Sequence, residues 1–127
     1  MIPFAWLFRA RGLRVNEYGR KTLALVVGDV APPLHTVLTF GQHMLISWLA
    51  AVPLLLALRR IDARRTRLLV GAVYGAGFYV VMNSWALPLA FGDPTPWQLG
   101  FEVVYPSLFI HLVYGIVIGF AARRHQP

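Results

Sequence analysis

The sequence predicts an all-α fold, a polytopic transmembrane helical bundle, from the length of its apolar stretches and the position of its charges. The apolar stretches cover residues 35–58, 68–91 and 99–122, and each exceeds the roughly 20 residues that a helix needs to cross a bilayer. Hydrophobic residues make up 57% of the 127 residues and charged residues only 13%, confined mostly to the gaps. A soluble domain of this size could not bury so much apolar surface, so the solvent is expected to be lipid.

Arginines gather in short segments beside the apolar stretches and give the chain most of its net charge of +7. The clusters that follow the first and last of these stretches contain Arg59, Arg60, Arg64, Arg65, Arg67, Arg123 and Arg124. Such clustering is typical of cytoplasmic loops under the positive-inside rule. Anionic lipid headgroups are therefore the expected partners. Nucleic acid is not an expected partner, because no stacking aromatic residues interleave with a solvated basic face.

The segment before the first long stretch leaves the number of crossings open. Residues 1–15, aromatic and basic, are expected to lie at the membrane surface. Residues 16–31 form a short first crossing in the preferred interpretation, with Arg20 and Lys21 reaching the interface. Crossings over 16–31, 35–58, 68–91 and 99–122 then place both termini in the cytoplasm of a bacterial inner membrane. A re-entrant first segment, or three crossings, is the alternative.

Small residues predict where the helices pack, because lipid tails provide little hydrophobic drive for helix association. Gly71 and Gly75 form one small-xxx-small pair, and Gly115 and Gly119 form another. These faces favour a tight bundle, with a homo-oligomer or a larger membrane complex as the alternative use. Three prolines fall within crossings and predict kinks: Pro53, Pro88 and Pro106.

Polar side chains at similar depth in the three long stretches form the first candidate site: His43, Ser47, Asn83, His111 and Tyr114. Intramembrane ionisable residues are costly and are candidates for function. The simplest interpretation is interhelical hydrogen bonding. The alternatives are a path for protons or a small solute, with His43, His111 and Asn83, and a bis-histidine haem site. No cofactor is otherwise expected.

Four residues are expected near the outer face: Asp29, His35, Asp93 and Glu102. Carboxylates and histidine can bind a divalent cation, but these spacings match no metal motif, so ordinary solvation or a loop ion pair is expected and no metal site. The chain has no cysteine and no nucleophile elbow, phosphate loop or His-Glu-x-x-His motif. The sequence therefore predicts a protein that is not an enzyme.

Several short motifs resemble the YagU-like family of small bacterial inner-membrane proteins. They are Asp29-Val-Ala-Pro-Pro33, Gly71-Ala-Val-Tyr-Gly75, Ala86-Leu-Pro-Leu89, and Glu102 before His111-Leu-Val-Tyr-Gly115. The basic residue that follows the double proline in that family is replaced by Leu34. The resemblance implies four helices, marks Asp29, Glu102 and His111 as candidate residues, and brings no established activity. The resulting hypothesis is a non-catalytic accessory or structural membrane subunit.

Overall fold

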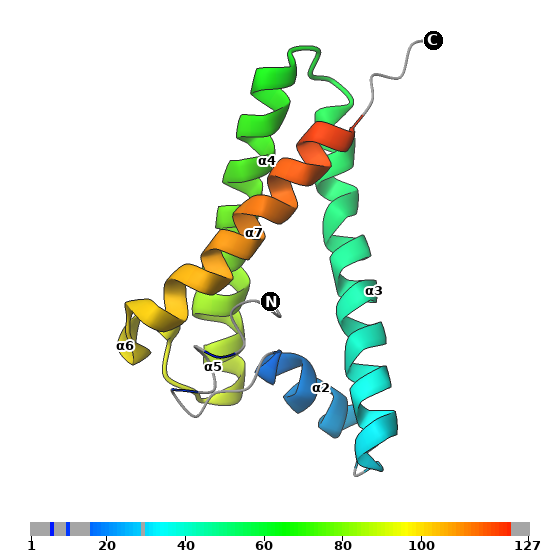
Figure 1. Cartoon of the computed structure of the whole chain (residues 1–127), viewed down its shortest axis with the longest axis vertical. Helices are drawn as coiled ribbons and strands as arrows, with labels where there is room; N and C mark the ends of the chain where they lie inside the picture. The colour runs from blue at the N-terminus through cyan, green and yellow to red at the C-terminus, as the bar shows by residue number, and fades with distance from the viewer. Residues whose placement is uncertain (1–5, 7–9, 11–15, 29, 123–127) are drawn as a thin grey trace.

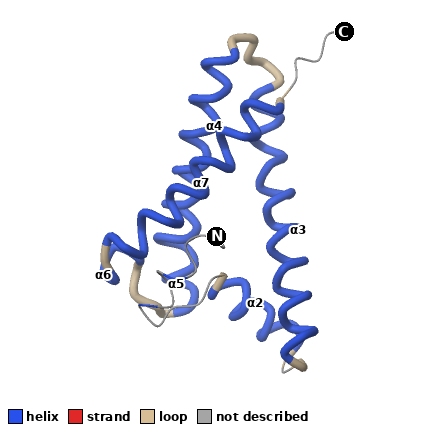
Figure 2. Tube along the Cα trace, in the orientation of Figure 1, coloured by secondary structure: helices blue, strands red, loops and turns tan. Residues whose placement is uncertain are grey.

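The computed structural model describes residues 16–28 and 30–122, together with Trp6 and Ala10, and the described residues are helical with short connections (Figures 1 and 2). The elements are α2 (Glu17–Val27), α3 (Pro32–Leu58), α4 (Arg64–Phe78), a π-helix η2 (Tyr79–Ala86), α5 (Leu87–Phe91), α6 (Pro96–Leu99) and α7 (Phe101–Ala121). The all-α fold class is confirmed. Three helices are long and apolar enough to cross a membrane, namely Pro32–Leu58, Arg64–Phe91 and Phe101–Ala121. The chain is a multi-pass membrane protein.

The second long helix contains the wider π-helical turn η2 between α4 and α5. Pro88 explains why the widening occurs here, because a proline lacks an N–H and its ring collides with the carbonyl four residues earlier in an α-helix. The N–H of Leu87 donates to the carbonyl of Met82, five residues earlier, as a π-turn requires. The wider turn therefore lets one helix run on past the proline.

α4 and α7 pack closely because glycines remove the side chains between their backbones. Gly71 faces Gly115, and a Cβ added to either residue would overlap the other's carbonyl oxygen. A Cβ on Gly75 would overlap the carbonyl oxygen of His111, and one on Gly119 would lie 2.5 Å from that of Arg67. Such direct backbone contact is how small residues bring membrane helices together.

The third long helix begins two residues later than the apolar stretch suggests. Thr95 and Gln98 form a reciprocal capping box that starts the separate short helix α6. Gly100, with a φ of 119°, then separates α6 from α7. This left-handed backbone suits glycine, so the apolar stretch predicted over 99–122 contains a turn before its crossing.

The short helix α2 does not run across the bundle as a first crossing over 16–31 would. Its 11 residues extend about 16 Å, against about 30 Å for the hydrocarbon core. Its start is tied to the α5–α6 connection by an ion pair between Lys21 and Asp93, and its end leads directly into α3. Both ends lie at the same end of the long helices (Figure 1). α2 is not among the three helices that are long and apolar enough to cross a membrane, and the crossing over 16–31 stays a prediction beside its re-entrant alternative.

The arginine-rich connection between α3 and α4 lies at the opposite end of the molecule from α2 (Figure 1). There Arg67 donates hydrogen bonds to the carbonyls of Ile61 and Asp62, and the Arg64 guanidinium lies 4.5 Å from the centre of the Phe120 ring. The end of α7 reaches the same end of the bundle. Arg123 and Arg124, like Asp29 and nearly all of the predicted 1–15 surface segment, lie outside the described residues.

Candidate functional site

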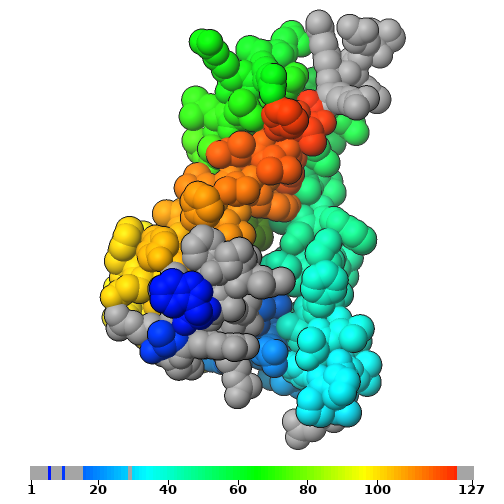
Figure 3. Space-filling view, viewed as in Figure 1, coloured from blue at the N-terminus to red at the C-terminus, as the bar shows by residue number. Residues whose placement is uncertain are grey.

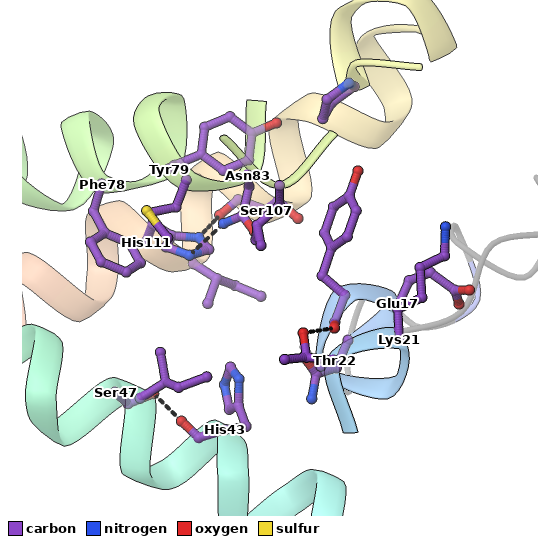
Figure 4. A pocket seen from close by; sticks show the side chains of 18 of the residues that line it. Glu17, Lys21, Thr22, His43, Ser47, Phe78, Tyr79, Asn83, Ser107 and His111 are labelled. Atoms are coloured by element: carbon purple, nitrogen blue, oxygen red, sulfur yellow. Dashed lines mark hydrogen bonds between the residues drawn. The ribbon is translucent and has the colours of Figure 1, made fainter. Parts of the chain in front are cut away.

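A cavity of about 490 Å³ separates α3 from the α4–α7 pair, and it is the candidate site. We call it the interhelical cavity. Its walls come from α3, the α4–η2 region and α7, and residues of α2 also line it (Figure 4). On the face shown in Figure 3, α3 and α7 separate from one another toward the end where α2 lies. It exists because α7 packs along α4 through glycines, whereas α3 diverges from both helices (Figure 1).

The wall formed by η2 and α7 holds His111 between two hydrogen bonds. The Nδ1–H group of His111 donates to the carbonyl of Ser107 at 2.7 Å, and Asn83 donates from Nδ2 to Nε2 of His111 at 3.1 Å. These partners fit the neutral Nδ1–H tautomer. The rings of Phe78 and Tyr79 lie 6.0 and 5.6 Å from the imidazole, centre to centre. His111 is thus fixed in orientation, with both ring nitrogens engaged (Figure 4).

Two tyrosines connect the α4–α7 pair to α3 at the deep end of the interhelical cavity. The hydroxyl of Tyr114 donates to the carbonyl of Ser47, and that of Tyr74 donates to the carbonyl of Ala50. The Ser47 hydroxyl itself donates to the carbonyl of His43 at 2.8 Å on the same helix. Hydroxyl-to-carbonyl bonds of this kind satisfy polar groups inside a bilayer and here they join the two walls.

The α3 wall presents Gln42 and His43 to the interhelical cavity with little of their hydrogen-bonding capacity used. Oε1 of Gln42 is buried and has no hydrogen-bond partner within the described part of the chain. The His43 imidazole points from α3 into the space opposite His111 (Figure 4). No hydrogen bond among the described residues joins the two histidines directly. His43 and His111, which the sequence predicts at a similar depth, therefore face the same cavity from two different walls.

Charged residues gather at the mouth of the interhelical cavity, where α2 meets the α5–α6 connection. Lys21 lies 2.5 Å from Asp93, and its ammonium lies 5.7 Å from the centre of the Phe91 ring. Tyr18 stacks on Phe91 with centres 5.7 Å apart. Burial, and then the carboxylate of Asp93, raise the pKa of the Tyr18 hydroxyl above its ordinary value. Glu17 also lines the mouth.

Of the four residues expected near the outer face, Asp29 lies outside the described residues, and the structure places the other three separately. Asp93 pairs with Lys21, and His35 lies in the first turn of α3, with its Nδ1 3.4 Å from the Thr39 hydroxyl. Glu102 lies in the first turn of α7. Over residues 16–28 and 30–122, no three histidine, aspartate or glutamate side chains gather closely enough to bind an ion.

Sequence reasoning missed the contributions of Gln42, Tyr79 and α2 to this site. Tyr79 follows Gly75 by four residues, so the glycine face of α4 could have indicated its side chain. The contribution of α2 had no comparable signal, because it depends on a chain reversal at Gly28, whose φ is 70°, and on an ion pair across 72 residues of sequence.

Comparison with known proteins gives one family match. Residues 34–127 match the family model described as the apolipoprotein N-acyltransferase N-terminal domain. Neither the curated proteins nor the solved structures contain a match to the chain. The expected relation to the YagU-like family is therefore wrong, because the matching model describes a different family. The motifs behind that resemblance are short and apolar, and they reflect glycine packing and proline-containing turns that unrelated membrane helices share.

Proposed function

Because the chain belongs to the family of the apolipoprotein N-acyltransferase N-terminal domain, we propose that it is a non-catalytic membrane domain that holds an acyl-bearing amphiphile in the interhelical cavity. The family name concerns N-acyl transfer to apolipoproteins. The part proposed for this chain is to bind the amphiphile, while the transfer itself is carried out elsewhere. The chain has no cysteine to serve as a nucleophile, in keeping with a non-catalytic part.

The observation that carries this proposal is the gradient of polarity along the interhelical cavity. Glu17, Lys21 and Asp93 provide charges at the mouth, whereas the lining includes apolar side chains such as Ile46 and Ile110. A volume of about 490 Å³ lies within the range of about 300–1,000 Å³ that is usual for small-molecule sites. A charged mouth above an apolar lining suits a molecule with a polar head and a hydrocarbon tail.

The membrane and its orientation belong to the same proposal. The family favours a bacterial inner membrane. The positive-inside rule favours a cytoplasmic position for the loop that carries Arg59, Arg60 and Arg64. The mouth, at the opposite end of the bundle, would then lie on the outer side. Anionic headgroups would contact the arginine loop.

The alternatives of a proton path and a haem site have less support from the geometry. Binding of iron by His111 would require its Nε2 to give up the hydrogen bond from Asn83. A proton relay would require a connection between His43 and His111, and no direct hydrogen bond joins them among the described residues. The proposed amphiphile requires neither change.

Photo-crosslinking with a monoacylglycerol that carries a diazirine in its acyl chain tests the proposal, using the full chain in nanodiscs. We expect the probe to label peptides on both walls, around Ile46 on α3 and Ile110 on α7. Ile46→Trp fills the cavity and should reduce this labelling at least fivefold. Leu45→Trp is the matched control, because Leu45 is 54% exposed and does not line the cavity. Equal labelling in the two variants would contradict the proposal.

A further inference from the structure

The polar residues of the interhelical cavity differ in whether their hydrogen-bonding groups have partners. On the η2–α7 side, His111 bonds to Ser107 and Asn83, and Tyr114 bonds across to α3. On the α3 side, the buried Oε1 of Gln42 has no partner among the described residues. On the η2 side, the buried hydroxyl of Tyr79 also has no partner among the described residues. Buried polar groups are normally paired, so Gln42 and Tyr79 mark two places in the cavity lining where a partner is missing, and at Gln42 the missing partner is a hydrogen-bond donor.

The position of Gln42 shows which part of a bound molecule would reach it. Gln42 lies ten residues after Pro32, about 15 Å along an α3 axis of about 40 Å. The charged residues at the mouth lie nearer the outer end, on α2 and the α5–α6 connection. Gln42 and His43 are therefore neutral groups below a charged rim, with apolar lining around them.

The chemistry of the two side chains defines the matching group. The carbonyl oxygen of Gln42 only accepts hydrogen bonds, and a neutral imidazole offers one donor and one acceptor. A hydroxyl or an amide N–H can donate to Gln42, whereas an ether or a simple alkyl chain cannot. Leaving a buried acceptor unpaired costs about 1–3 kcal/mol, which is about fivefold to about 150-fold in affinity.

We propose that Gln42, assisted by His43, makes the interhelical cavity selective for one class of amphiphile. These amphiphiles carry a hydroxyl or amide N–H group that can lie beside Gln42, about one-third of the way along α3. This inference rests on the proposed function, because it specifies the ligand of the same cavity. It adds a chemical class of ligand and names the residue that selects it.

Competition against the diazirine probe tests this selectivity, with 1-hexadecanol, hexadecanamide and hexadecyl methyl ether as competitors. The alcohol and the amide should displace the probe at about tenfold lower concentration than the ether, which has no donor. Gln42→Met, close in size but without the acceptor, should reduce the preference to less than twofold. Gln98→Met is the control, because Gln98 lies on α6 outside the cavity.

The outcomes separate this inference from the proposed function. If the probe labels the cavity but the three competitors displace it equally, the selectivity is overturned and the amphiphile site stands. That result is expected if water already satisfies Gln42. If the tenfold preference persists in Gln42→Met, then Gln42 is not the selecting residue. If the probe does not label the cavity at all, the proposed function itself fails, and the selectivity fails with it.

Discussion

At the scale of single residues, His111 shows how a membrane helix can carry an ionisable side chain. Its two ring nitrogens are engaged by Ser107 and Asn83, and the rings of Phe78 and Tyr79 lie next to the imidazole. Because these contacts hold the imidazole in one orientation, its side chain joins η2 to α7 as a structural element. His43, at a similar depth, lacks such bonds among the described residues, so two histidines that look alike in the sequence have different environments.

The bond between Asn83 and His111 should be measurable as a coupling energy. In a double-mutant cycle with Asn83→Leu and His111→Phe, we expect about 0.6 kcal/mol and at most about 1.7 kcal/mol, as for other hydrogen bonds between membrane helices. Unfolding in mixed micelles provides the free energies. The cycle of Asn83→Leu with His43→Phe is the control and should show no coupling. Similar coupling in both cycles would show that the bond is not specific.

At the scale of elements, glycine position decides which helices touch. Gly71, Gly75, Gly115 and Gly119 all lie where an added Cβ would meet backbone atoms of the facing helix. Gly77, only two residues after Gly75, has nothing within 4 Å of its Cβ position. The small-xxx-small spacing therefore distinguishes the glycines that contact the facing helix from Gly77, which lies on an open face of the same helix.

Replacing one contact glycine should separate α4 from α7. Gly115→Ala places a methyl group on the carbonyl of Gly71, and we expect a loss of about 1–3 kcal/mol or more in the free energy of unfolding. Gly77→Ala meets open space and should be neutral or stabilising by up to about 1 kcal/mol, through helix propensity. Steric trapping or unfolding in mixed micelles can measure both variants. Equal losses would argue against the glycine contact.

At the scale of the whole molecule, the shape results from one tight helix pair and one divergent helix. α3 diverges from α4 and α7 (Figure 1), and tyrosine hydroxyls reach across to its carbonyls. α2 occupies the wide end, where Lys21 pairs with Asp93. A bundle closed at one end and divergent at the other encloses a cavity without any long loop.

The placement of α2 makes a topological prediction that cysteine labelling can test, since the chain has no native cysteine. Thr66→Cys, at the arginine-rich end, and Pro94→Cys, in the α5–α6 connection, should react from opposite sides of the membrane. Glu17→Cys, at the start of α2, should react from the same side as Pro94→Cys. If it reacts from the side of Thr66→Cys instead, residues 16–31 cross the membrane, as the four-crossing interpretation predicts.

The sequence by itself determined the class of fold and the three long helices, because burial in lipid demands about 20 continuous apolar residues and local composition records that demand directly. Glycine spacing likewise indicated the faces on which α4 and α7 meet, since that contact depends on residues four apart on one helix.

Only the tertiary structure decided the position of α2, the widened turn at Tyr79–Ala86 and the cavity between the two walls. Each depends on interactions between residues far apart in the chain, such as Lys21 with Asp93. Apolar composition specifies that a helix lies in lipid, but not how far it diverges from its neighbour. The divergence of α3 creates the cavity that Gln42 and His43 line.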